Sequence, residues 1–202
     1  MRFRKEGDLR LISHRDLARL LERLFRRADL PLSMSEGFHP KPRISFPAPL
    51  AVGVLGVDEV LEVELAQKLS AAEVLERLAL HAPPGLAFVS AEEQAAGTRK
   101  VQVRRVTYEM PLPSERRDHA RTAIESLLAA SDHVVQRPDR GAQVDLRAKI
   151  DGLVLVEDRM RFHVLVTREG SARPREVLAA LGLADLEQEG LYLTRTAVEV
   201  EP

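Results

Sequence analysis

The feature that most constrains the fold is an amphipathic segment near the N-terminus, at residues 14–29. Ser13 precedes it as an N-cap, and Asp16 three residues later completes a capping-box pattern. Apolar side chains recur on one face at helical spacing, at Leu17, Leu20, Leu21, Leu24, Phe25 and Ala28. Pro31 ends the pattern, because proline cannot continue a helix. The spacing therefore predicts a helix, and the segments around it decide the fold class.

Strand and helix patterns alternate along the rest of the chain. The first half has strand patterns at 1–5, 9–12, 32–35, 43–46, 60–65 and 86–90, and a second capped helix from Ser70 to about residue 81. The second half has strand patterns at 101–110, 133–136, 143–150, 153–156, 161–167 and 191–200, and helices from Ser114 and near Pro174.

This β-α-β-β-α-β order predicts an α+β protein of two tandem ferredoxin-like units with antiparallel sheets. The expected domains are residues 1–96 and 97–202, with a polar linker at 92–100. The alternative is one mixed α+β domain with a larger shared sheet.

Composition excludes several classes of site. The 202 residues include no Cys, so this chain can hold no disulfide, thiolate metal site or iron–sulfur cluster. The first residues are charged, and no long apolar run appears anywhere. We therefore expect no signal peptide, no membrane contact and a cytoplasmic location.

Charge is distributed unevenly although the net charge is −1. Residues 1–43 carry 11 Lys and Arg against 6 Asp and Glu, a net charge of +5. Residues 44–96 carry 2 basic against 8 acidic side chains, a net charge of −6. A basic and an acidic segment in one chain suggest two functional faces.

The basic segment has two parts that suit a polyanion. Its helix carries a row of guanidinium groups, which can each bind two phosphate oxygens. The loop at 36–46 combines Gly37 with Pro40 and Pro42, which stiffen the chain, and it would present Phe38 for stacking on a base. The predicted RNA-binding residues are Arg15, Arg19, Arg23, Arg26, Arg27, Phe38, His39, Lys41 and Arg43.

Other interpretations of the two parts remain open. The arginines could pair with acids such as Asp16 and Glu22, or with the acidic middle segment. The loop could be an ordinary stiffened turn with Phe38 in the core. His14 and His39 are candidate catalytic residues, since a metal-independent ribonuclease needs a base and an acid near neutral pKa.

No metal-binding spacing, Ser-His-Asp pattern or phosphate loop is present in the sequence, and no cofactor is expected on this chain. In the second half, Asp145 and Arg147 are expected on the same face of a strand, where they could pair. Arg173 and Arg175 lie at a helix start, where a bound anion or Glu169 and Glu176 would compensate them.

Several strings carry a family resemblance. They are ISHRDL at 12–17 with Arg23, SEGFHPKPRISF at 35–46, PLAVGV at 49–54, VDLR at 144–147, GSARP at 170–174 and LTRT, with Arg195, at 193–196. The chain resembles the radical SAM-linked protein family, an uncharacterised bacterial family encoded beside, or fused to, a radical SAM protein. The resemblance implies a radical SAM partner that carries the iron–sulfur cluster and S-adenosylmethionine. It adds Asp145, Arg147, Arg173 and Arg195 as second-half site candidates.

Three functions follow as expectations. The first is an RNA-binding accessory protein of a radical SAM enzyme, acting in tRNA or rRNA modification or processing, with no catalytic activity of its own. The second is a metal-independent endoribonuclease that uses His14 and His39, and a fold-level likeness to CRISPR repeat-processing endoribonucleases points the same way. The third is a protein-interaction scaffold without RNA.

Overall fold

The computed structural model describes residues 1–95, 97–137 and 141–201. This part of the chain is a mixed α/β structure with antiparallel-rich sheets and five α-helices. It divides into two compact units, Met1–Gln102 (unit 1) and Val103–Glu201 (unit 2). The predicted domains, 1–96 and 97–202, stay a prediction, because compactness does not show independent folding. No helix within the described residues is both long and apolar enough to cross a membrane.

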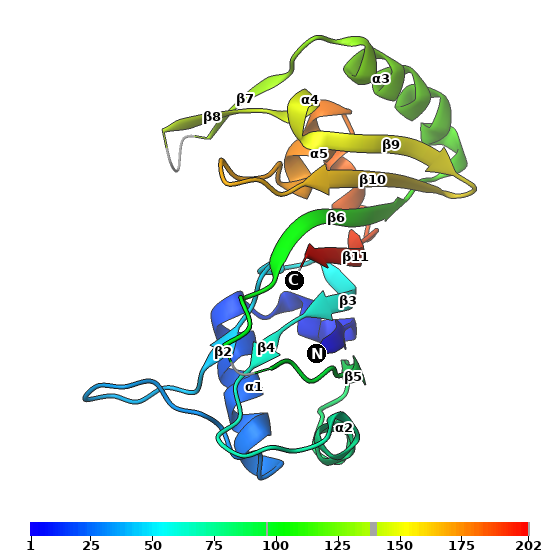
Figure 1. The fold of residues 1–202 in the computed structure, drawn as a ribbon. Coiled ribbons are helices and arrows are strands. Elements are labelled where there is room, and N and C mark those ends of the chain that lie inside the picture. Colours follow the sequence, from blue (N-terminus) through cyan, green and yellow to red (C-terminus); the bar gives the residue numbers. More distant parts are fainter. Residues whose placement is uncertain (96, 138–140, 202) are drawn as a thin grey trace. The chain divides into compact units, whose positions relative to one another are not determined.

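Unit 1 places two helices on a small antiparallel sheet (Figure 1). Its strands lie in the order β5-β1-β3, with β1 antiparallel to both neighbours, and β2 pairs with β4. The elements are β1 (Arg2–Lys5), the 3-10 helix η1 (Gly7–Leu11), α1 (His14–Arg27), β2 (Ile44–Ser45), β3 (Leu55–Val60), β4 (Glu62–Val63), α2 (Ala71–Ala79) and β5 (Leu86–Ser90).

The predicted N-terminal helix is confirmed as α1. The Asp16 N–H donates to Ser13 Oγ over 3.1 Å, as the N-cap pattern requires. Asp29, just past the helix, adopts a positive φ of 50°, which turns the chain away before Pro31. The apolar face of α1 joins α2 and the sheet in one core, formed by Phe3, Leu17, Leu21, Leu24, Phe25, Ala28, Leu30, Leu61, Val74, Leu78 and Leu86.

Three strand predictions in unit 1 are wrong. The single strand expected at 60–65 is divided, because β3 ends at Val60 and β4 covers only Glu62–Val63. Residues 9–12 were expected to be extended but belong mostly to η1. Residues 32–35 form no strand and make only the isolated bridges Leu32↔Leu65 and Met34↔Pro42. Pro40 and Pro42 have no N–H to donate, so a regular ladder cannot extend along this loop.

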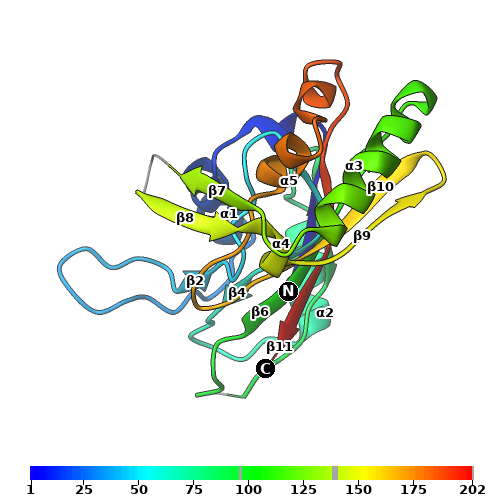
Figure 2. The same ribbon diagram turned by 90° about the horizontal axis from the view of Figure 1, so that it is seen from above.

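Unit 2 has strands in the order β11-β6-β10-β9, and a separate two-stranded ribbon, β7–β8 (Figure 2). β10 is antiparallel to both β6 and β9. The elements are β6 (Gln102–Pro111), η2 (Ser114–Arg116), α3 (Arg117–Ala129), β7 (Val134–Arg137), β8 (Ala142–Asp145), α4 (Leu146–Lys149), β9 (Ile150–Val156), β10 (Arg159–Leu165), α5 (Pro174–Ala180), η3 (Ala184–Glu187) and β11 (Thr194–Glu201).

One strand prediction in unit 2 is also wrong. Residues 143–150 were expected as a single strand, but β8 ends at Asp145 and the short helix α4 follows. Asp145 caps α4 by accepting the Arg147 N–H over 2.9 Å. A capping aspartate thus turns an alternating strand pattern into a helix start.

Candidate functional site

The arginines of α1 form an exposed row on the side opposite the apolar face. The five side chains, Arg15, Arg19, Arg23, Arg26 and Arg27, are all exposed, whereas Leu17, Leu21, Leu24 and Phe25 are buried. Four of them recur every fourth residue, so successive guanidinium groups leave the helix about 6 Å apart along its axis. We call these five residues the arginine row.

The arginine row is almost free of counter-ions. Among the described residues, its single ion pair joins Arg19 to Asp16 at 3.6 Å, between two largely exposed side chains. No ion pair to Glu22 or to the acidic segment 44–96 is present in this part of the chain. Surface pairs of this kind contribute little to stability. Four guanidinium groups are therefore available to an external anion.

The loop that was predicted to be rigid is closed by hydrogen bonds between its two arms. We call residues 33–43 the projecting loop, because it extends away from the body of unit 1 on the α1 side in both Figure 1 and Figure 2. The Ser35 N–H donates to Lys41 O over 2.8 Å, and the Lys41 N–H donates to Ser35 Oγ over 3.0 Å. The Arg43 N–H donates to Ser33 O over 2.9 Å. These bonds close the loop below its tip.

Phe38 lies at this tip and is 102% exposed. The alternative that Phe38 belongs to the core is therefore wrong. His39 and Lys41 beside it are exposed as well. Arg43 differs from them, because its guanidinium pairs with Glu64 at 3.2 Å, and Ser33 Oγ also donates to Glu64. Arg43 thus holds the base of the projecting loop against β4.

His14 has a more enclosed position than the arginine row that begins beside it. Its imidazole meets the ring of Phe46 edge-on, with centroids 4.9 Å apart. Burial lowers the pKa of His14, and the positive charge of Lys5 lowers it further. The neutral imidazole is thereby favoured, which suits a hydrogen-bond acceptor or a general base.

Lys5, whose charge acts on His14, and Glu59 are buried charged residues that the sequence interpretation missed. They are 0% and 2% exposed, and Lys5 Nζ donates to Ile12 O over 3.4 Å. Lys5 faces Gly56 on the neighbouring strand, and a Cβ at Gly56 would lie 2.6 Å from Glu59 Oε1. The Glu59 side chain therefore covers the strand partner of Lys5. The alternation in β1 could have indicated Lys5, because it points to the same side as buried Phe3.

The two candidate catalytic histidines are not in contact in the described structure. His14 lies against Phe46 at the start of α1, whereas His39 lies at the exposed tip of the projecting loop. An acid–base mechanism would need both within hydrogen-bond reach of one substrate. Catalysis by this pair stays a prediction.

Asp145 and Arg147 do not form the expected pair on a strand face. Asp145 accepts the N–H groups of His133 and Arg147, each over 2.9 Å, and these bonds lower its pKa. Arg147 lies in α4 and its Nε donates to Leu128 O over 3.2 Å. Both side chains thus connect β7, α4 and α3 inside unit 2.

Arg173 and Arg195 also occupy positions within the secondary structure of unit 2. Arg173 is the N-cap residue of α5, and its N–H donates to Glu176 Oε2 over 2.8 Å. Arg195 on β11 is only 2% exposed. Glu176 therefore provides the negative charge that was expected at this helix start. Arg175 pairs with Glu187 at 2.6 Å, and Glu169 pairs with Lys149 at 3.3 Å.

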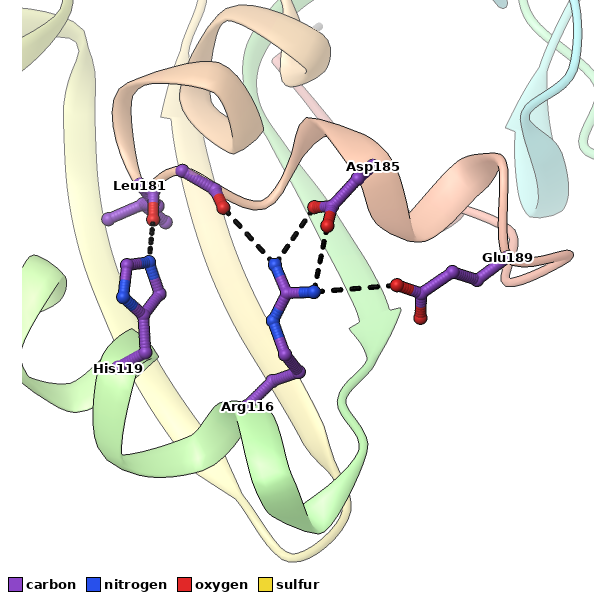
Figure 3. Close-up of polar contacts among 6 residues, drawn as sticks. Arg116, His119, Leu181, Asp185 and Glu189 are labelled. Carbon is purple, nitrogen blue, oxygen red and sulfur yellow. Dashed lines mark hydrogen bonds and ion pairs between the residues drawn. The ribbon is translucent and has the colours of Figure 1, made fainter.

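A polar cluster fastens η2 to η3 and the start of α3 to the end of α5 (Figure 3). Arg116 donates to both oxygens of Asp185, over 2.8 and 2.9 Å, and lies 3.4 Å from Glu189. The hydrogen bond from Arg116 lowers the pKa of Asp185. Nearby, His119 Nε2 donates to the carbonyl of Leu181, the C-cap of α5, over 3.0 Å. No sequence motif indicated this cluster.

The cluster borders a hollow of about 330 Å³ in unit 2, lined mainly by small side chains together with His119 and His133. In the described residues no group of three or more His, Cys, Asp or Glu side chains could hold a metal ion.

Fold and site together define a two-unit α/β protein with one strongly basic helix and an exposed aromatic loop. Residues 1–174 match the family described as "Uncharacterized protein conserved in bacteria (DUF2344)". The chain belongs to this family, which covers all of unit 1 and most of unit 2. No match was found among the curated proteins.

Proposed function

We propose that this protein binds RNA through the arginine row and the projecting loop, as an accessory protein of a radical SAM enzyme in tRNA or rRNA modification or processing. The observation that carries the proposal is the arginine row. It combines five exposed guanidinium groups on one helix, and within the described residues they make a single weak ion pair, from Arg19 to Asp16.

The arginine row is unfavourable for the isolated helix. Arg15, Arg19, Arg23 and Arg27 make three successive like-charge contacts at i,i+4, and each destabilises a helix by roughly 0.2–0.5 kcal/mol. A bound polyanion would offset this repulsion. Guanidinium groups suit phosphates because the planar fork donates two parallel hydrogen bonds.

The projecting loop supports RNA rather than a simple anion. Phe38 offers a fully exposed ring for base stacking, and Lys41 lies close to it in the sequence. His14 continues the surface at the start of α1, with an imidazole that favours its neutral form.

The radical SAM partnership rests on the sequence resemblance. The partner would carry the iron–sulfur cluster and S-adenosylmethionine, since this chain has no Cys. A cytoplasmic location belongs to the same proposal. We also propose that both units are ferredoxin-like, which the strand orders β5-β1-β3 and β11-β6-β10-β9 support.

The test is RNA binding measured by fluorescence anisotropy at several salt concentrations. Wild-type affinity should fall steeply with salt, and Arg19→Glu with Arg23→Glu should reduce binding at least a hundred-fold. Loss of two phosphate contacts should also reduce the log–log salt slope by about 1.4–1.8. The matched control reverses two exposed arginines of unit 2, Arg104→Glu with Arg121→Glu, and should bind like wild type.

Two outcomes would reject RNA binding. Binding that does not depend on salt, or no binding to total cellular RNA, contradicts the proposal. Nuclease-resistant co-purification with a protein partner, lost in the Arg19→Glu, Arg23→Glu variant, would favour the scaffold instead.

An endoribonuclease is the second candidate, favoured by the lowered pKa of His14. RNA incubated with EDTA should then be cleaved by wild type and left intact by His14→Ala and His39→Ala. Intact RNA in every reaction would remove this candidate.

A further inference from the structure

Phe38 contributes nothing to the fold of unit 1. It is 102% exposed, whereas Phe3 and Phe25 of the same unit are buried in the core. The printed ring contacts of unit 1 involve Phe3, Phe25, Phe46, Phe88 and His14, and none of those in the described residues includes Phe38. An aromatic ring with no role in folding can serve a ligand instead.

The projecting loop holds this ring away from the core of unit 1. Below the ring, Met34 bridges to Pro42, and Leu32 bridges to Leu65. Three residues, 35–37, separate Met34 from Phe38, and the chain bends at 36–39 instead of continuing as a strand. Pro40 restricts the chain beyond the ring, and reciprocal hydrogen bonds between Ser35 and Lys41 close the loop beneath it. The ring therefore loses little conformational freedom when it binds.

The ligand has to offer an exposed flat face to this ring. A base inside a duplex has both faces covered by its neighbours, whereas an unpaired base can be splayed out and stacked on an aromatic side chain. We infer, on the basis of the proposed function, that the ligand is RNA with unpaired nucleotides. Phe38 stacks on one unpaired base while the arginine row binds phosphates of the same molecule.

The surroundings of Phe38 favour a base over an apolar pocket of a protein. Glu36, His39 and Lys41 are exposed polar residues around Phe38, and the other exposed large apolar side chain of the projecting loop, Met34, lies four residues before the ring and is 40% exposed. Protein interfaces concentrate their binding energy in buried clusters of several residues. A single ring among polar side chains matches the way that single-strand binding proteins present one ring per base.

The experiment compares three RNA probes with the full chain: a stem with an unpaired loop, an unstructured single strand and a blunt duplex. Phe38→Ala should weaken binding to the first two about ten-fold or more and leave duplex binding unchanged. Phe38→Tyr keeps the ring and should restore the affinity. Leu80→Ala, which removes another highly exposed apolar side chain of unit 1, is the matched control and should bind like wild type.

Two further measurements separate stacking from charge. Phe38→Ala should keep the wild-type salt slope, because it removes no phosphate contact, whereas Arg19→Glu with Arg23→Glu should reduce it. A 2-aminopurine in the unpaired loop should change its fluorescence on binding to wild type but not to Phe38→Ala.

The outcomes distinguish this inference from the proposed function. If wild type binds no probe, both are wrong. If wild type binds with a steep salt dependence but Phe38→Ala binds all three probes equally well, only the inference is overturned. Unchanged RNA binding with loss of a co-purifying protein in Phe38→Ala would assign the ring to a protein partner and would also overturn it.

Discussion

In α1 five arginines are exposed and make one weak ion pair to the residues that the structure describes, whereas in unit 2 most arginines with a described partner pair with carboxylates. The closest pairs of unit 2 are Arg105–Asp151, Arg105–Glu199, Arg116–Asp185, Arg137–Glu176, Arg161–Glu109 and Arg175–Glu187, all between 2.6 and 2.8 Å. The same side chain thus holds elements together in one unit and is left for a ligand in the other. Local charge counts cannot make this distinction, because it depends on where the acids lie.

The largest loss of stability should follow the removal of a buried, paired arginine of unit 2. Arg137 is 8% exposed, and its guanidinium holds Glu176 at 2.6 Å. Burial acts to raise the pKa of Glu176, but hydrogen bonds from Arg137 and from the Arg173 N–H outweigh it and lower the pKa. Arg137→Met should lower the free energy of unfolding by about 3 kcal/mol, measured in urea, because the largely buried Glu176 carboxylate then keeps only the Arg173 N–H and the Arg173 guanidinium 4.0 Å away. A loss below about 1 kcal/mol would show that Glu176 finds another partner.

Unit 1 also has buried charged side chains, and removing one of them should lower its stability, as in unit 2. Lys5→Met should lower the free energy of unfolding by about 2 kcal/mol, because buried Glu59 then loses the cation beside its strand. The same change should raise the pKa of His14 toward its usual value, since the Lys5 charge holds it down. NMR titration of the imidazole measures this shift. An unchanged His14 pKa would mean that burial alone lowers it.

His14 should also make stability depend on pH. Its pKa is lower in the folded state than in the unfolded state, so the unfolded chain binds the proton first on acidification. Stability should therefore fall as the pH drops below about 6.5, until the folded-state pKa is passed. His14→Gln should flatten this part of the curve in urea unfolding at several pH values. His39→Gln is the control, and an equal effect of both variants would contradict the assignment.

The smallest expected effect is an increase in the free energy of unfolding. Arg23 has like-charge neighbours at Arg19 and Arg27, so Arg23→Gln should raise the free energy of unfolding by a few tenths of a kcal/mol at low salt. Arg175→Gln should instead lower it, because Arg175 pairs with Glu187 at 2.6 Å. Thermal unfolding at low and high salt measures both. A loss of stability in Arg23→Gln would mean that the arginine row serves the fold.

The sequence by itself determined the local elements with strong signals. Capping residues and helical spacing predicted α1 from Ser13 and α2 from Ser70, and the alternation before Ser90 predicted β5. The same spacing placed the arginine row opposite the core. These features depend on residues close together in the chain, so periodicity and caps suffice to predict them.

Only the tertiary structure decided which charges have partners. It tied Arg43 to Glu64 and Arg137 to Glu176, buried Lys5 and Arg195, and left the arginine row and Phe38 exposed. It also made Asp145 a helix cap rather than a strand residue. The physical reason is that a counter-ion or a burial site lies tens of residues away in the chain, where the local pattern carries no information. Proximity in the fold separates a structural arginine from one that remains available to a ligand.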